Sequence, residues 1–159
     1  MRKVLISDKL SSAAADILRD AGIVVDVKPG LSKEELGNII GDYDGLAIRS
    51  ATKVTSELLN KAPRLKVVGR AGIGVDNVDI AAATAAGVVV MNTPFGNAVT
   101  TAEHAISMLL ALARQIPQAH ISTIASKWEK SKFMGTEISA KRLGIIGCGN
   151  IGAIVADRA

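Results

Sequence analysis

The chain has 159 residues, of which 48% are hydrophobic and only 3% aromatic, and its formal net charge is +4 at pH 7. Its core must therefore be built from Val, Ile, Leu and Ala, which favours an α/β fold over an aromatic-rich β-sandwich. The excess of positive charge is small and contains no long basic run, so we expect no nucleic-acid binding and consider a small anionic substrate compatible with it.

Cysteine content and hydropathy indicate where the protein works. Cys148 is the only cysteine, which excludes an intramolecular disulfide and fits a reducing cytosol. The apolar residues 4–6 are too few for a signal peptide. The longest apolar stretch, residues 105–113, has about half the length that a membrane span requires. We therefore expect a cytoplasmic protein with no membrane partner.

From the first residue onward, short apolar runs alternate with amphipathic stretches, a pattern typical of βαβ units. The predicted strands are residues 4–6, 23–27, 45–48, 65–68 and 88–91. The predicted helices between them are residues 11–19, 33–40, 56–61 and 79–86. Five strands with intervening helices predict a doubly wound, flavodoxin-like parallel sheet.

Helix-capping residues support two of these helices. Ser32 and Glu35 have the spacing of a capping box, in which each side chain accepts a hydrogen bond from the other residue's free backbone N–H. Asn77 is the predicted N-cap of the helix over 79–86, and Gly87 its predicted end.

Beyond the fifth strand the pattern changes. Residues 92–97 are rich in turn formers, and the predicted helix over 100–115 has hardly any polar face. A helix that is apolar all round is buried on several sides. Two arrangements fit: a central helix of one core, or a helix shared with a partner subunit. A further helix over 116–126 and a polar loop over 128–136 follow.

The chain closes with a glycine motif in a strand-turn-helix context. Residues 143–146 are predicted as a strand, and Gly147, Gly149 and Gly152 form the pattern G-x-G-x-x-G before an apolar helix. In dinucleotide-binding folds these glycines permit the tight turn, the approach of a pyrophosphate and close packing of the helix. The motif predicts the start of a Rossmann nucleotide-binding lobe. The acidic residue for the ribose lies about twenty residues further on in such lobes, so we expect a longer protein.

A second constellation follows two neighbouring strands. Arg70 precedes Gly72 and Gly74, whose backbone could point consecutive amides at one anion, and Arg49 follows the third strand. Carboxyl ends of parallel strands meet at one edge, where ligands of open α/β sheets bind. Two arginines and an amide nest suit a substrate with two acidic groups. The alternatives are an ordinary strand-to-helix turn and solvated surface arginines.

The histidines and acidic residues of the chain do not have the spacing of a catalytic or metal site. His104 and His120 lie in helical stretches without a second ligand at metal spacing, so both are expected to be structural or exposed. Asp76, Asp79 and Glu103 fit capping or helix-surface positions better than acid/base roles.

Four stretches resemble the D-2-hydroxyacid dehydrogenases. They read AIRSATKVT (47–55), VGRAGIGVDNVD (68–79), VMNTPFGNAVTTAEHAISMLLALARQIPQA (90–119) and KWEKSKFMGTEISAKRLGIIGCGNIG (127–152). The resemblance covers essentially the whole chain. The residues of the first and last stretches resemble those of the phosphoglycerate dehydrogenases within that family.

The resemblance implies two lobes and a reaction. Residues 1–93 would form a substrate-binding lobe that lacks its returning C-terminal segment, and residues 94–159 the beginning of an NAD-binding lobe. The reaction would be hydride transfer from C2 of 3-phosphoglycerate to NAD, giving 3-phosphohydroxypyruvate in serine biosynthesis. The helix over 100–115 would contribute to a homodimer or homotetramer.

The resemblance also assigns residues. Gly72, Ile73 and Gly74 would hold the substrate carboxylate; the other substrate-binding residues would be Arg49, Ser50, Arg70 and, at the hinge, Asn97. The cofactor-binding residues would be Ile73, Gly147, Gly149, Asn150, Ile151 and Gly152. Many relatives have an arginine in place of Asn150, which is expected to weaken the contact with the pyrophosphate.

The family's catalytic arginine, glutamate and histidine lie beyond residue 159, so no catalytic residue is assigned here and the chain alone is expected to be inactive. Two other functions stay open at this point. One is another D-2-hydroxyacid dehydrogenase, such as a glyoxylate/hydroxypyruvate reductase or a D-lactate dehydrogenase. The other is an NAD-sensing, corepressor-like interaction protein built on the same fold.

Overall fold

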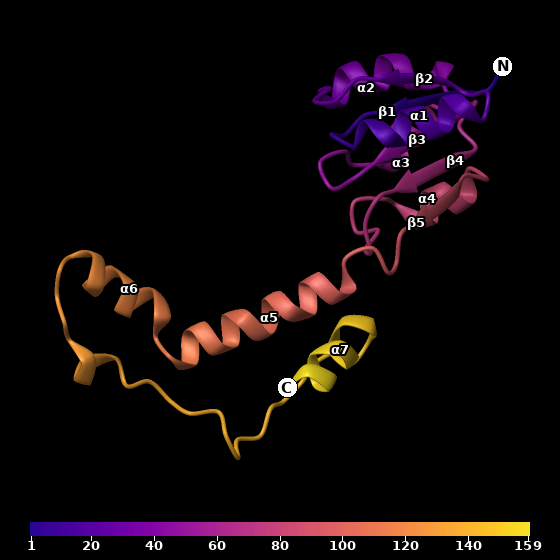
Figure 1. Ribbon diagram of the computed structural model, residues 1–159. Helices are drawn as coiled ribbons and strands as arrows, with labels where there is room; N and C mark the ends of the chain where they lie inside the picture. The colour runs from indigo at the N-terminus through magenta and orange to yellow at the C-terminus, as the bar shows by residue number, and fades with distance from the viewer. The chain divides into compact units, whose positions relative to one another are not determined.

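Five short apolar strands pair in parallel in the order β2-β1-β3-β4-β5 (Figure 1). Their bounds are β1 Lys3–Ile6, β2 Val24–Val27, β3 Gly45–Ile48, β4 Val67–Arg70 and β5 Val89–Asn92. This order is that of flavodoxin-like doubly wound sheets, and it confirms the predicted fold class.

The computed structural model describes all residues 1–159 and contains two compact units, Met1–Gly96 and Asn97–Ala159. The sheet belongs to the first unit. Its helices are α1 Ser12–Asp20, α2 Lys33–Ile39, the 3₁₀ turn η1 Ile40–Asp42, α3 Ser56–Asn60 and α4 Ile80–Ala85. Each predicted helix of this unit is present, close to its expected bounds.

The predicted helix cap is present at α2, whereas α4 has a different cap from the one predicted. The Ser32 hydroxyl accepts the Glu35 N–H at 3.2 Å and the Glu35 carboxylate accepts the Ser32 N–H at 2.8 Å, which confirms the capping box. The prediction of Asn77 as the cap of α4 is wrong, because the Asp79 carboxylate accepts the Ala82 N–H at 2.9 Å. Asn77 is thereby free for contacts outside the helix.

The two faces of the sheet are covered unequally. One face packs under α2, α3 and α4, and its buried centre comprises Leu5, Leu46, Ile48 and Val68. The other face packs under α1 and contains only Ile6, Ala15 and Val25 as buried apolar residues. On β5 the side chains of Val89 and Met91 are 59% and 58% exposed. The face that carries α1 is therefore uncovered at the β5 end.

The fourth strand lies two residues later than predicted. Its register is set by β3, in which Gly45 pairs with Val67 and Ile48 pairs with Arg70. Leu65 is buried and apolar but precedes this pairing, so hydropathy alone misplaced the strand. Arg70 consequently ends the strand instead of following it.

Tyr43, two residues before β3, contacts β2 through its hydroxyl. The side chain is 2% exposed, and its hydroxyl donates to the Asp26 carboxylate at 2.7 Å. The Lys3 ammonium lies 2.9 Å from the same carboxylate and 4.6 Å from the centre of the Tyr43 ring. Burial and the neighbouring Asp26 raise the pKa of Tyr43 from 10.0 to about 12.

We expect Tyr43→Phe to lower the free energy of unfolding by about 1.5 kcal/mol at neutral pH, the usual net value of a hydrogen bond to a charged group. Because folding raises the pKa of Tyr43, its contribution is fully present below pH 10.0 and is lost as pH rises through about 12. Urea unfolding of both proteins should show the difference shrinking over that interval. Tyr43 is the only tyrosine, so phenolate absorbance measures its titration directly; an ordinary midpoint would contradict the prediction.

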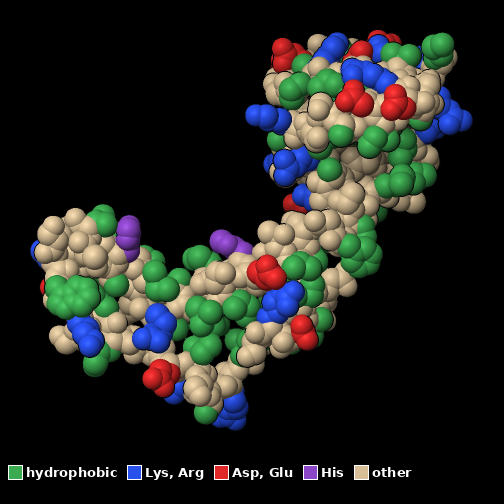
Figure 2. All heavy atoms as spheres, viewed as in Figure 1, with side chains coloured by type: hydrophobic (Ala, Val, Ile, Leu, Met, Phe, Trp, Pro, Cys, Tyr) green, Lys and Arg blue, Asp and Glu red, His purple; other side chains and the backbone are tan.

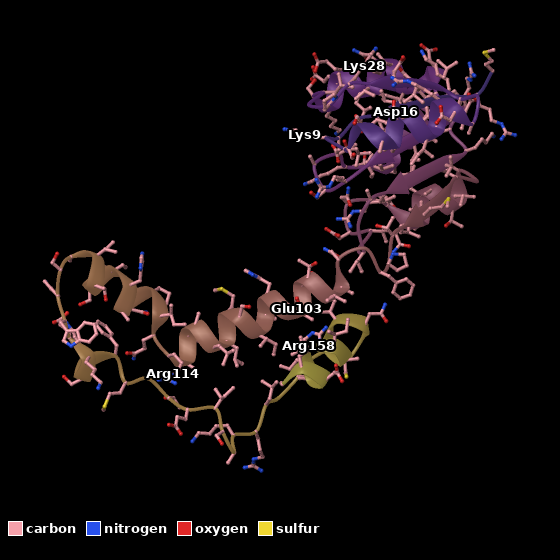
Figure 3. The ribbon with its side chains drawn as sticks, in the orientation of Figure 1. Lys9, Asp16, Lys28, Glu103, Arg114 and Arg158 are labelled. Carbon is pink, nitrogen blue, oxygen red and sulfur yellow. The ribbon has the colours of Figure 1, made fainter.

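The second unit is helical. Its elements are α5 Ala98–Ala113, α6 Ile116–Ile124, the 3₁₀ turn η2 Lys130–Phe133 and α7 Asn150–Arg158. Gln115, in the left-handed region at φ 52°, separates α5 from α6. Helices α5 and α7 pack together, with the Arg158 guanidinium 3.1 Å from the Glu103 carboxylate (Figure 3). None of the helices is both long and apolar enough to cross a bilayer.

One prediction for this unit is wrong and another is only partly tested. Residues 143–146 form no strand, because a strand needs a hydrogen-bonded neighbour and the second unit contains none. The helix predicted over 100–115 is α5. Within this chain it is not the central helix of one core, and the alternative, a helix shared with a partner subunit, stays a prediction. Leu112 and Met108 are 77% and 58% exposed, and Figure 2 shows hydrophobic side chains on the surface of this unit. Several apolar side chains of α5 are therefore not buried by any other part of this chain.

Candidate functional site

The carboxyl ends of β1, β3 and β4 meet at one edge of the sheet, which we call the carboxyl edge. Three segments form it: Asp8 after β1, the β3–α3 loop (residues 49–55) and the β4–α4 loop (residues 71–79). An isolated parallel bridge between Val54 and Val78 holds the two loops together. The edge therefore collects the loops on which the sequence placed its substrate residues.

Asp8 holds the β3–α3 loop from the β1 side. One carboxylate oxygen accepts the backbone N–H groups of Arg49, Ala51 and Thr52 at 2.6, 3.2 and 3.2 Å. The other accepts the Thr52 hydroxyl at 2.6 Å. Since that hydroxyl proton points to Asp8, the Ser7 hydroxyl donates to Thr52 at 2.8 Å. A carboxylate suits this place because it accepts at both oxygens.

The charge state of Asp8 follows from these contacts. The carboxylate is buried, with the residue 5% exposed. Burial raises the pKa of Asp8, but hydrogen bonds from the Thr52 hydroxyl and from three backbone N–H groups outweigh that effect and hold the pKa below its ordinary value. Asp8 is therefore ionised at neutral pH.

Asn77 holds the same loop from the β4 side. Its side-chain amide donates to the Arg49 carbonyl at 2.7 Å and to the Thr52 carbonyl at 2.6 Å. Its backbone carbonyl accepts the Val54 N–H at 2.8 Å, and the Asp79 N–H donates to the Val54 carbonyl at 2.8 Å. Sequence reasoning missed Asn77 as a loop anchor, since a side chain that bridges two loops leaves no local pattern.

Arg49 and Ser50 lie at the start of the β3–α3 loop, and both are exposed. Their side chains form no ion pair or hydrogen bond within the chain. The backbone of Arg49 is held at both its N–H and its carbonyl. The arrangement presents a free guanidinium and a hydroxyl on a fixed backbone, as binding of an anionic group requires.

The Arg70 side chain is held within the chain, and its contact with a substrate stays a prediction. Its side chain is 11% exposed, donates to the Gly74 carbonyl and lies 3.5 Å from the Asp76 carboxylate. Its Nε is buried without a partner. The guanidinium thus folds back over the β4–α4 loop, and only a rearrangement of Asp76 would free it for an outside anion.

The glycines of the β4–α4 loop make room for that arginine. A Cβ on Gly72 would lie 2.6 Å from the Arg70 guanidinium, and one on Gly74 would lie 2.9 Å from the Asp76 carboxylate. The Gly72 N–H donates to the Arg70 carbonyl at 3.0 Å. The Ile73 carbonyl accepts the Asn92 side chain at 2.7 Å. The Gly72 N–H is therefore engaged within the chain, and the amides of Ile73 and Gly74 are left for the predicted anion contact.

The cavity nearest this edge involves other residues. It measures about 350 Å³ and lies between the β3–α3 loop and α2. Its polar and charged lining residues are Ser7, Asp8, Lys33, Thr52, Lys53 and Thr55. None of Arg49, Ser50 and Arg70 lines it. The predicted substrate residues thus lie on an open edge of the first unit and not in an enclosed pocket.

In the second unit the glycine motif forms the start of a helix. Gly147 has φ 88°, Gly149 is the N-cap of α7, and Asn150 and Ile151 are its first two residues. A Cβ on Gly152 would overlap the Gly147 carbonyl oxygen, whereas those on Gly147 and Gly149 would meet no atom within 4 Å. The turn is therefore closely packed at Gly152 and open beside Gly147 and Gly149, the shape that a pyrophosphate needs.

Asn97 begins the second unit. Its backbone carbonyl accepts the N–H and the hydroxyl of Thr101 at 2.9 and 2.8 Å, and its side chain caps nothing. A substrate contact of Asn97 stays a prediction.

Comparison with known proteins gives the family. A family model described as "D-isomer specific 2-hydroxyacid dehydrogenase, catalytic domain" matches residues 4–158. The D-3-phosphoglycerate dehydrogenase of Sus scrofa is 57% identical over 158 residues, which are 99% of this chain and 30% of that protein. The chain spans about 30% of the length of curated relatives that it matches, among them the D-3-phosphoglycerate dehydrogenases of Sus scrofa and Homo sapiens.

Solved structures agree with the sequence relatives. The TT0316 protein from Thermus thermophilus aligns with a TM-score of 0.88 at 32% identity, over 98% of this chain and 52% of its own. The NAD-dependent formate dehydrogenase from Staphylococcus aureus, in complex with NAD, aligns with a TM-score of 0.84 at 28% identity, over 99% of this chain and 53% of its own. The chain belongs to the D-isomer specific 2-hydroxyacid dehydrogenase family and is homologous to D-3-phosphoglycerate dehydrogenases.

Proposed function

We propose that this chain is part of an NAD-dependent D-3-phosphoglycerate dehydrogenase, in which it supplies the first substrate-binding residues and the start of the NAD site. The whole protein would oxidise D-3-phosphoglycerate to 3-phosphohydroxypyruvate, the first step toward serine, in the cytoplasm. The observation that carries the proposal is the identity of 46–57% to phosphoglycerate dehydrogenases across nearly the whole chain.

For the domains, we propose a substrate-binding lobe over residues 1–93 and the beginning of an NAD-binding lobe over 94–159. The exposed Val89 and Met91 on β5 support an incomplete first lobe, because a doubly wound sheet normally carries helices over both faces. A returning segment of the whole protein would cover them. The exposed apolar side chains of α5 support a subunit contact in a homodimer or homotetramer.

For the substrate, the carboxyl edge offers groups for two anionic ends. Arg49 supplies a free guanidinium and Ser50 a hydroxyl. The amides of Ile73 and Gly74 would receive the carboxylate, and Gly72, whose own N–H donates to the Arg70 carbonyl, would leave room for it in the loop. Arg70 would contribute only when Asp76 releases it. Asn97 would approach from the hinge. One loop would thus supply a cationic side chain and the other would supply backbone amides. Together they favour a phosphorylated acid over an uncharged substrate.

For the cofactor, the geometry of the glycine turn fits a dinucleotide. The first N–H groups of α7, at Asn150, Ile151 and Gly152, have no acceptor within the helix, and the space beside Gly147 and Gly149 is open. Bound NAD would accept the hydride from C2 of the substrate. Ile73 would lie against the nicotinamide end. The residues of this chain bind and orient the reactants, and no residue here takes the proton.

The test is turnover by the full-length protein, meaning the natural polypeptide that contains this chain. We expect NADH formation with D-3-phosphoglycerate at a kcat/KM at least about tenfold above that with glycerate or D-lactate, and no NADH formation by residues 1–159 alone. Preference for lactate, or reduction of glyoxylate or hydroxypyruvate in the reverse assay, would replace the proposal by another dehydrogenase. NAD binding without any turnover would favour the corepressor-like interaction protein.

A further inference from the structure

The β3–α3 loop is held on both sides at the same two residues. Asp8 accepts the N–H of Arg49 and of Thr52, and Asn77 donates to the carbonyl of each. The two anchors come from different segments: Asp8 follows β1, and Asn77 lies in the β4–α4 loop. With its N–H and carbonyl both bound, the peptide backbone at Arg49 has no freedom to rotate without breaking a hydrogen bond.

This arrangement differs from ordinary loop packing in its chemistry. Four donors converge on one buried carboxylate, which includes a contact as short as 2.6 Å from the Arg49 N–H. The Arg49 side chain has no partner of its own in the chain. The backbone therefore fixes the point from which this side chain projects and the direction of its Cα–Cβ bond.

We propose that Asp8 and Asn77 are positioning residues that clamp the β3–α3 loop and aim Arg49 and Ser50 at the substrate. The inference rests on the proposed function in one respect, because it takes Arg49 and Ser50 as substrate contacts. The clamp lowers the conformational entropy that the loop loses when substrate binds, and so favours the bound geometry in advance.

Substitutions at the two anchors separate the clamp from general stability. Asp8→Ala leaves three N–H groups without an acceptor, whereas Asp8→Asn keeps one oxygen for them, and the Thr52 hydroxyl can turn to accept from the new amide. Asn77→Ala removes both donors from the opposite side and tests the clamp even where Asp8→Ala fails to fold. The matched control is Asp79→Ala, which removes the cap of α4 two residues from Asn77 but no side-chain contact with the loop.

The first measurement does not depend on the reaction. Amide hydrogen exchange at Arg49, Ala51 and Thr52 in the full-length protein should accelerate about 10- to 100-fold in Asp8→Ala, since the loop opens more readily without its acceptor. Asp8→Asn should restore most of the protection, and Asp79→Ala should leave it unchanged. Equal exchange in all variants would overturn the clamp whatever the enzyme's substrate is.

The second measurement is steady-state kinetics on the same proteins. In Asp8→Ala and Asn77→Ala the KM for D-3-phosphoglycerate should rise about tenfold or more, with the KM for NAD within about twofold of the original. Asp79→Ala should match the parent in both constants. Faster exchange with an unchanged substrate KM would show that the clamp does not position Arg49. Inactivity of the parent protein on phosphoglycerate would instead refute the proposed function, and the KM comparison would move to the acid that it does oxidise.

Discussion

Replacing Gly152 with alanine is expected to weaken NAD binding to the full-length protein by up to about 100-fold. The new Cβ would overlap the Gly147 carbonyl oxygen and lie 3.2 Å from the Gly147 carbonyl carbon. Both are backbone atoms, so α7 must move away from the turn; overpacking of this kind costs about 3 kcal/mol, which corresponds to about 100-fold. Isothermal titration with NAD measures the loss.

Two neighbouring glycines serve as controls for that experiment. A Cβ on Gly144 or on Gly149 meets no atom within 4 Å. Gly144→Ala lies outside the motif and should bind NAD like the parent protein. Gly149→Ala should keep the melting temperature but lose affinity, because its methyl group would occupy the space proposed for the pyrophosphate. NAD binding of parental strength in Gly152→Ala would show that the turn does not hold the cofactor.

Arg49→Ala should raise the KM for D-3-phosphoglycerate about 10- to 100-fold in the full-length protein. A hydrogen bond between charged groups contributes about 1.5–3 kcal/mol, and each 1.4 kcal/mol corresponds to a factor of about ten. Its side chain has no partner within the chain, so the substitution removes no structural contact and stability should hold. Arg49→Lys should recover only part of the affinity, because an ammonium lacks the two parallel donors of a guanidinium.

The control for Arg49 is Arg2→Ala. Arg2 is also exposed but precedes β1, and so lies at the opposite end of the strands. Steady-state kinetics should show its KM values unchanged, as should the KM for NAD in Arg49→Ala. A substrate KM that does not respond to Arg49→Ala would remove this residue from the proposed site.

Much of the carboxyl edge could be predicted from the sequence, because parallel strands present their carboxyl ends together. Arg49 follows β3 and Arg70 ends β4, and both are at that edge. The partners of the Arg70 side chain could not be predicted in this way. Its partners, the Gly74 carbonyl and Asp76, are only four and six residues away, but the preference for them over solvent depends on how the loop folds back.

The anchors of the β3–α3 loop show a different limit. Asp8 lies 41 and 44 residues from its partners Arg49 and Thr52, and Asn77 lies 28 and 25 residues from the same two. Asp8 lies two residues after a predicted strand, so a signal like that used for Arg49 was present there as well. The position of Asn77 just before a helix predicts a cap, because capping depends on neighbouring residues. The two carbonyls to which its side chain donates lie instead in the β3–α3 loop.

Sequence alone was sufficient to predict the α/β class, four of the five strands to within a residue, the capping box and the family. Each of these depends on a pattern of residues that are close together in the chain. Tertiary structure decided the start of β4, the cap of α4, the position of the Arg70 guanidinium and the absence of a strand over 143–146. Each of these depends on a hydrogen-bond or packing partner distant in the chain or missing from its unit. The free energy of such a contact depends on the residues of both segments, so the sequence pattern of one segment could not predict the contact.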